Sequence, residues 1–73
     1  MAKKTVRGEK HIPQGQKMKH SDAFDEALDN ALQNADAEWG GGTTVATVRY
    51  VAVVETQSPG NIHEYRVFLD PTP

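Results

Sequence analysis

The chain has 73 residues, a formal net charge of −2 at pH 7 and no cysteine. A sequence of this length forms one domain at most, so we expect a single domain over residues 1–73. Domains this small usually need disulfides, a metal or a partner subunit for a comfortable margin of stability. The lack of cysteine excludes disulfides and thiolate metal sites, and the histidines lack ligand spacing, so we expect no metal. Self-association is the stabilising device that remains.

The hydropathy of the chain bears on its location. No apolar stretch is long enough for the hydrophobic segment of a signal peptide or for a membrane span. We therefore expect a cytoplasmic protein without a membrane partner. The absence of cysteine is compatible with that compartment.

Basic residues are concentrated at the start of the chain, and residues 1–4 are expected to be flexible. Six of the eight basic residues lie in the first twenty positions, namely Lys3, Lys4, Arg7, Lys10, Lys17 and Lys19. Such a segment can bind nucleic acid or an anionic surface, or it can pair with an acidic helix of its own fold or of a neighbouring subunit. It offers no Phe, Tyr or Trp for base stacking, which favours the pairing role over a nucleic-acid partner.

Residues 5–12 predict a first β-strand. Their side chains alternate loosely, with Val6 and Ile12 on one side, and Gly8 weakens the pattern. Pro13 ends the strand. The polar stretch that follows, PQGQKMKH, predicts a connecting loop.

Residues 21–39 predict a helix. Apolar side chains recur with helical spacing along one narrow stripe, which consists of Phe24, Ala27, Leu28, Ala31, Leu32, Ala35 and Trp39. Ser21 or Asp22 is expected to cap the free amides at its start, and Gly40 to end it with a left-handed residue. The alanines allow a close approach to a flat surface such as a sheet.

Residues 43–57 predict a long strand in which neither face is fully polar. The even positions form the more continuously apolar set, and we expect them to face the helix; they are Thr44, Ala46, Val48, Tyr50, Ala52, Val54 and Thr56. The odd positions still carry Val45, Val51 and Val53. One amphipathic helix cannot cover both faces of a sheet, so we expect a second chain to cover the other face.

A turn and a last strand complete the pattern. Residues 58–61, Ser-Pro-Gly-Asn, predict a type II turn, because proline presets its first central position and glycine supplies the positive φ of the second. Residues 62–70 predict a strand that Pro71 and Pro73 end. The expected fold class is α+β, with β-α-β-β order and one helix across a three-stranded antiparallel sheet.

No group of residues in the sequence suggests catalysis, and we expect no enzyme. Ser21 and Ser58 are explained as a helix cap and a turn residue. The triple glycine at 40–42 follows a helix and precedes a strand, which is the wrong order for a phosphate-binding loop.

Three side chains are candidates for ligand binding. Trp39 either closes the small core or stacks on a planar ligand at a subunit junction. Arg49 and Arg66 are expected on one sheet face, where they either pair with Glu55 or Glu64 across strands or bind an anion.

In its order of elements the chain resembles the dodecins, small β-α-β-β proteins that form hollow dodecamers and bind flavins. The resemblance covers residues 5–70 and rests on the serine-led helix SDAFDEALDNALQNA, the long second strand that ends in a Pro-Gly turn, and the last strand HEYRVFL. It implies a homo-oligomer and a flavin ligand (FMN, FAD or riboflavin). The family's site uses an aromatic residue entering the second strand and a glutamine in the last strand. Here Trp39 precedes the triple glycine, and Arg66 stands at the position of the glutamine.

We therefore expect a non-enzymatic, homo-oligomeric protein of dodecin-like type that binds or sequesters a small ligand. One alternative is an oligomeric module whose basic N-terminal arm binds nucleic acid or an acidic protein. Another is an interaction protein without a small ligand, whose exposed sheet face serves a different partner.

Overall fold

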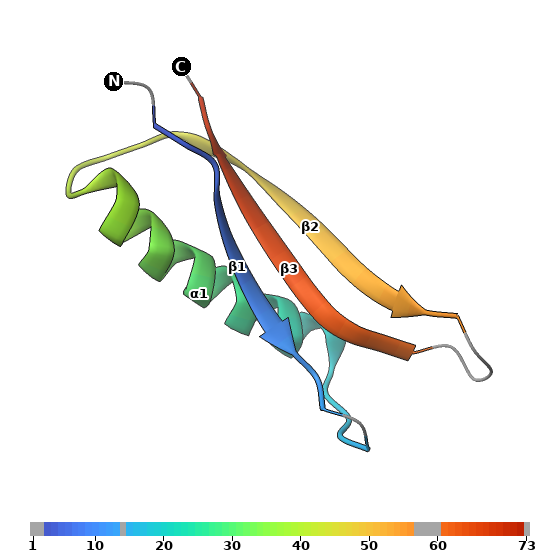
Figure 1. Cartoon of the computed structure of the whole chain (residues 1–73). Coiled ribbons are helices and arrows are strands. Elements are labelled where there is room, and N and C mark those ends of the chain that lie inside the picture. Colours follow the sequence, from blue (N-terminus) through green and yellow to red (C-terminus); the bar gives the residue numbers. More distant parts are fainter. Residues whose placement is uncertain (1–2, 14, 57–60, 73) are drawn as a thin grey trace.

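A computed structural model of the chain describes residues 3–13, 15–56 and 61–72. Its elements follow in the order β1 (Val6–His11), α1 (His20–Trp39), β2 (Ala46–Glu55) and β3 (Asn61–Pro71). The three strands form one antiparallel sheet, and α1 lies against one of its faces (Figure 1). The predicted α+β class and β-α-β-β order are confirmed.

The strand order in the sheet is β1-β3-β2, so that β3 is the central strand and β1 and β2 are the edges. Along the β2–β3 hairpin, Tyr50 lies opposite Val67 and Arg49 opposite Phe68. A register shift follows Val53, beyond which Val54 lies opposite Ile62. Three of the four residues of the predicted turn, 58–60, lie outside the described part of the chain.

The core lies between α1 and the two strands beneath it, β1 and β3. The helix contributes only alanines to the buried core. The core residues are Val6, Ala23, Ala27, Ala31, Ala35, Tyr65, Val67 and Leu69. These alanines carry no atom beyond Cβ, so the helix axis approaches the sheet closely. The larger apolar side chains of the helix, Phe24, Leu28 and Trp39, pack around this core while remaining partly exposed.

Gly8 is the closest point between helix and sheet. A Cβ atom at this position would lie 2.1 Å from the Ala31 backbone nitrogen and 2.3 Å from the Ala27 carbonyl oxygen. The helix backbone therefore rests directly on the backbone of β1, where no side chain other than hydrogen fits. The glycine that weakens β1 as a strand is the residue that lets α1 dock.

The second strand extends beyond the cover of the helix. The even positions of β2 lie on the helix side of the sheet, as predicted, because Ala52, Tyr50 and Val48 are opposite the buried side chains of β3. The helix does not cover them, however, and Val48, Tyr50 and Val54 are 40, 55 and 53% exposed. The strand is also shorter than residues 43–57. The even face is thus on the helix side but largely outside the cover of α1, because the contact with Gly8 holds the helix over β1 and β3.

The ends of α1 match the prediction at one end only. Lys19 occupies the N-cap position, and no side chain caps the first amides, so the predicted cap by Ser21 or Asp22 is wrong. The helix starts one residue earlier, at His20, whose Nδ1 is 2.5 Å from the Tyr65 hydroxyl. At the other end Gly40 has a φ of 76° and donates its N–H to the Asp36 carbonyl at 3.1 Å, which confirms the predicted glycine stop.

The contact at Gly8 predicts a large penalty for one methyl group. Gly8→Ala would place its Cβ inside the van der Waals radius of two backbone atoms of α1, and the helix would have to move away from the sheet. We expect a loss of about 2–3 kcal/mol in the free energy of unfolding, at the upper end of overpacking effects. Urea denaturation followed by circular dichroism measures it.

Gly41→Ala is the matched control, since its Cβ would meet nothing within 4 Å. We expect that variant to unfold within about 0.5 kcal/mol of the natural chain. Equal stability of the two alanine variants would contradict the docking role of Gly8.

Candidate functional site

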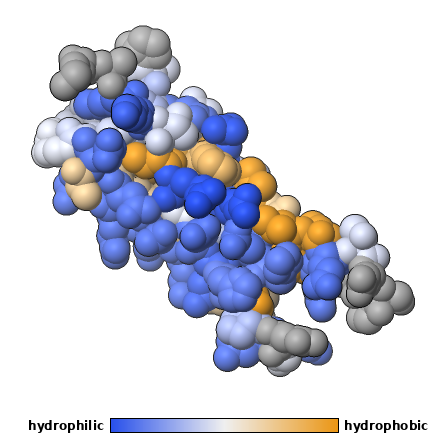
Figure 2. Space-filling view, in the orientation of Figure 1, coloured by the Kyte–Doolittle hydropathy of each residue, from blue (hydrophilic) through white to orange (hydrophobic). Residues whose placement is uncertain are grey.

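The most unusual surface of the molecule is the apolar one around β2. The exposed large apolar side chains of the described residues are Leu32, Val45, Val48, Tyr50 and Val54. All except Leu32 belong to β2 or to the residue preceding it. Figure 2 shows a band of apolar side chains along the course of β2, bordered by mostly polar side chains on the visible face. Exposed apolar residues gathered in this way mark interaction or ligand-binding surfaces.

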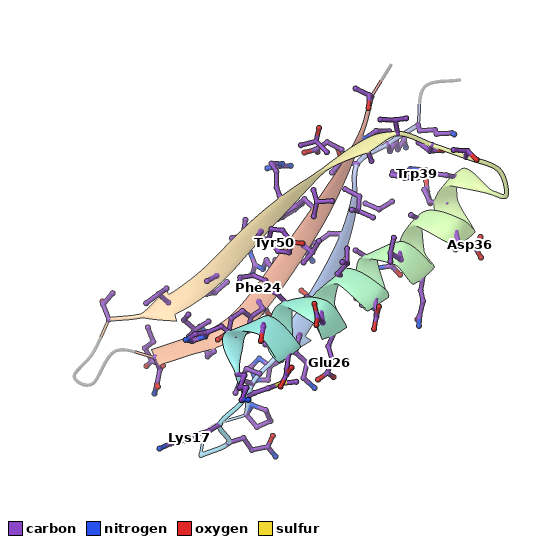
Figure 3. The ribbon with its side chains drawn as sticks, turned by 180° about the vertical axis from the view of Figure 1, so that it is seen from behind. Lys17, Phe24, Glu26, Asp36, Trp39 and Tyr50 are labelled. Carbon is purple, nitrogen blue, oxygen red and sulfur yellow. The ribbon has the colours of Figure 1, made fainter. Side chains whose placement is uncertain are left out.

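An aromatic cluster joins β2 to the N-terminal half of the helix. The ring of Phe24 meets Tyr50 edge-on at 5.1 Å and Tyr65 edge-on at 4.8 Å. Figure 3 shows Phe24 and Tyr50 directed toward each other from α1 and β2. Each edge-to-face pair contributes about 0.5–1.5 kcal/mol beyond its burial. Tyr50 is nevertheless more than half exposed, so the cluster keeps one open side.

Trp39 lies at the opposite end of α1 from Phe24 (Figure 3). Its indole Nε1 donates a hydrogen bond of 2.7 Å to the carbonyl oxygen of Lys4, and the ring packs against the edge of the core. The side chain therefore has a structural role, tying the segment before β1 to the end of the helix. The residue is only partly buried.

Arg49 stands on the outer face of the sheet, the face turned away from α1. Its Nε and Nη2 donate to the two carboxylate oxygens of Asp70 at 2.5 and 3.0 Å, and its guanidinium lies 4.7 Å from the centre of the Phe68 ring. Thr5 donates a further hydrogen bond of 2.8 Å to Asp70. The hydrogen bonds from Arg49, and then that from Thr5, lower the pKa of Asp70 below its ordinary value. The same contact raises the pKa of Arg49.

Arg66 lies on the same outer face, as predicted, since it is opposite Val51 while Arg49 is opposite Phe68. Its guanidinium forms a short ion pair with Glu64, two residues earlier on the same strand. Neither arginine has the cross-strand partner that the sequence suggested. Arg49 pairs with Asp70 rather than with Glu55 or Glu64, because Asp70 lies on the same face two residues beyond Phe68 and accepts both N–H groups.

The three predicted binding residues do not converge within one chain. Trp39 belongs to the end of the helix, on one side of the sheet, whereas Arg49 and Arg66 project from the opposite side. A ligand that touched the tryptophan and an arginine together would have to lie between two copies of the chain.

A polar depression on the surface is a weaker candidate for a binding site than the apolar surface around β2. A shallow, open depression is lined by Glu9, Lys10, Glu26, Asp29, Asn30 and Gln33. Lys10 forms an ion pair with Glu26 at 3.3 Å across it. Within the described ranges, no three histidine, aspartate or glutamate side chains are grouped so as to hold a metal ion. The depression is therefore best described as a solvated face of charged pairs.

Two asparagines of α1 hydrogen-bond to the backbone of β1, a role that the sequence alone does not reveal. Asn34 Nδ2 donates to the Arg7 carbonyl at 2.6 Å, and the Glu9 backbone N–H donates to Asn30 Oδ1 at 3.0 Å. These bonds occupy two of the outward-facing backbone groups of β1. The spacing of four between the asparagines places them on one side of the helix, which was the available signal, but a polar helix face predicts solvent as readily as a strand edge.

Comparisons with family models, with curated proteins and with solved structures find no match for this chain. In the described part of the chain, no helix is both long enough and apolar enough to cross a bilayer. The function is therefore inferred from the chain's own residues.

The contact between Arg49 and Asp70 predicts an acid-dependent effect. Because the pKa of Asp70 is lowered in the folded chain, its stabilising contribution is present above the unfolded value of about 3.9 and is lost as the pH falls through the lower folded value. Carbon-13 NMR of the Asp70 carboxyl measures the titration. Arg49→Gln is expected to move the midpoint upward toward the ordinary value.

Arg7→Gln serves as the control, since Arg7 pairs with Glu9 on the same face at 3.7 Å and has no contact with Asp70. It should leave the Asp70 midpoint in place. An unchanged midpoint in the Arg49 variant would show that the bidentate contact does not persist in solution.

Proposed function

We propose that this chain is the subunit of a non-enzymatic homo-oligomer of dodecin-like type that binds or sequesters a small planar ligand, with a flavin as the first candidate. Two features of the chain carry the proposal. The helix leaves the apolar side chains of β2 uncovered, and a partly exposed tryptophan lies at the end of the same helix. The first feature supports self-association and the second supports stacking at a junction between subunits.

Self-association is supported by the amount of apolar side chain left in water. Val48, Tyr50 and Val54 stand on the helix side of β2, and Val51 and Val53 on its outer face are only partly buried. Removing apolar surface from water is worth about 25 cal/mol per Å², and a chain of this size has few other sources of stability. A second copy is the simplest cover, because it brings the same apolar strand.

A planar ligand is supported by the aromatic side chains of Trp39, Phe24 and Tyr50. Offset stacking on an indole ring selects flat, polarisable molecules such as an isoalloxazine. Arg49 and Arg66 each donate to a carboxylate, and a guanidinium also suits a phosphate group. If either arginine joins the site in the assembly, FMN or FAD is favoured over riboflavin.

The non-enzymatic part of the proposal rests on the residue types present. The chain has no cysteine. In the ranges that the structure describes, no hydrogen bond joins a serine or threonine hydroxyl to a histidine. Binding without chemical conversion is the activity that these side chains support.

The alternative role for the basic N-terminal residues gains no specific support. Lys10 pairs with Glu26 of α1 and Arg7 with Glu9, so two of these charges are engaged within the fold. Lys3 donates a short hydrogen bond to the Thr44 hydroxyl. This arrangement agrees with the pairing role that the sequence favoured.

The stacking role of Trp39 can be separated from its structural role with two substitutions. Trp39→Phe and Trp39→Leu both remove the hydrogen bond to Lys4, but only the first keeps an aromatic face. Binding is measured by the fluorescence of FMN and of riboflavin titrated with protein. We expect quenching by the natural chain, similar binding with the phenylalanine variant and a dissociation constant about tenfold larger with the leucine variant.

Circular dichroism of both variants checks that they are folded. Equal losses in the two variants would assign Trp39 a purely structural role. No change in flavin fluorescence at any protein concentration would remove flavin as the ligand.

A further inference from the structure

The two edge strands of the sheet, β1 and β2, differ in how well they are protected from pairing with another chain. On β1, Asn30 and Asn34 of the helix hydrogen-bond to the backbone N–H of Glu9 and the carbonyl of Arg7. The strand is also only six residues long. Short length and satisfied backbone groups are the usual means by which an edge strand is protected from pairing with another chain. The β1 edge is therefore partly protected by α1.

The β2 edge lacks this protection. It spans ten residues, Ala46–Glu55, with no proline and only two charged side chains. Among the residues that the structure describes, no side chain hydrogen-bonds to the backbone of this strand. A long, apolar and unprotected edge strand is a template for a further strand. The pattern of charge along β2 indicates which strand pairs with this edge.

The outer face of β2 carries, in order, Arg49, Val51, Val53 and Glu55. In an antiparallel pair of identical strands, residues directly opposite each other point to the same face. If Ala52 lies opposite its own copy, Arg49 lies opposite Glu55 of the partner subunit, and this happens twice. Between these two ion pairs, Val51 lies opposite Val53 of the partner subunit. The strand is thus complementary to itself in both charge and apolar character.

We propose that two copies of the chain join through β2 in this register, about a two-fold axis at Ala52, into a continuous six-stranded sheet. The inference deepens the self-association on which the proposed function rests, by naming the strand and the register. Centring the pair on Arg49 or on Glu55 instead would place like charges opposite each other, which is destabilising. Registers centred on Tyr50 or Val51 leave the arginine opposite a valine.

Both charged groups are available for this pairing. Arg49 uses its Nε and one hydrogen of Nη2 for Asp70, and a guanidinium has five N–H donors, so three remain for a second carboxylate. In the described part of the chain Glu55 has no ion-pair partner. The Arg49 side chain can therefore bridge Asp70 of its own chain and Glu55 of the partner subunit.

The same register also places apolar side chains opposite each other on the helix side. Tyr50, 55% exposed, lies opposite Val54 of the partner subunit, and Ala52 lies opposite its own copy. Such aromatic–β-branched pairs are favoured across strands. A single contact between copies thus gives partners to Tyr50 and Val54 on the helix side and to Val51 and Val53 on the outer face.

Cross-linking tests the register directly, because the natural chain has no cysteine. In the proposed pair the two Ala52 Cα atoms are about 4.5–5.5 Å apart, within the range of a disulfide. We expect Ala52→Cys to form a covalent dimer under mild oxidation, seen on a non-reducing gel at low micromolar concentration.

Ala46→Cys is the matched control, on the same strand, the same face and with similar partial burial. In the proposed register the two copies of this position are about twelve residues apart along the strands, roughly 40 Å, so no cross-link should form. A cross-link at Ala46→Cys as fast as that at Ala52→Cys, or none at Ala52→Cys, would overturn the register.

A charge substitution gives a second, reversible measurement. Glu55→Arg replaces two attractive pairs by two repulsive ones, and we expect the dissociation constant of the dimer to rise about tenfold or more by sedimentation equilibrium. Glu38→Arg makes the same change of charge on an exposed position of the helix and should leave the constant unchanged. Equal effects of the two substitutions would contradict the proposed ion pairs.

The failure of this inference differs from the failure of the proposed function. A natural chain that is monomeric at millimolar concentration by light scattering removes both the self-association and the β2 pairing. A chain that assembles without cross-linking at Ala52→Cys keeps the proposed oligomer and removes only this interface. Flavin titration tests the ligand separately from either result.

Discussion

The structure depends on the contact between the backbone of α1 and the backbone of β1 at Gly8. Because that glycine has no side chain and the facing helix positions are alanines, the helix sits close to the sheet, but it sits over β1 and the central strand. A helix about 10 Å in diameter covers about two strands spaced 4.8 Å apart. The third strand, β2, is therefore uncovered as a direct geometric result of where the helix is held. Its apolar side chains remain exposed although their positions in the sequence are typical of a core.

Many of the polar groups, in contrast, have partners within the chain. Asn30 and Asn34 satisfy two of the outer backbone groups of β1. On the outer face, Arg49 and Arg66 pair with acids of their own chain. Exposed ion pairs of this kind contribute little to stability, typically about 0–1 kcal/mol each. What the single chain leaves unsatisfied is therefore mainly apolar surface and the backbone edge of β2, and hydrophobic burial is the larger of the available driving forces.

Much of the fold could be predicted from local patterns. The helical spacing from Phe24 to Trp39 and the positive-φ stop at Gly40 placed the helix, and alternation placed the strands and assigned the even positions of β2 to the correct side. Periodicity gives the face of an element but not its lateral position, so it could not show that α1 misses β2. From the sequence alone Gly8 counts only as a weakness of its strand, because a backbone contact with a helix 19 or more residues away leaves no local signal. The partner of Arg49 depended on the same kind of long-range register, which composition does not contain.

The positions of the candidate binding residues connect ligand binding with assembly. Trp39 lies on the helix side of the sheet and the two arginines on the outer side, so one chain cannot present them to the same small molecule. If the ligand is held between copies, as proposed, its binding energy adds to the free energy of assembly, and each process strengthens the other by the same amount. The apparent affinity for the ligand then rises with protein concentration, whereas a site contained in one chain would show no such dependence. A chain with a small core of alanines and valines would thereby gain stability from its partner and from its ligand together.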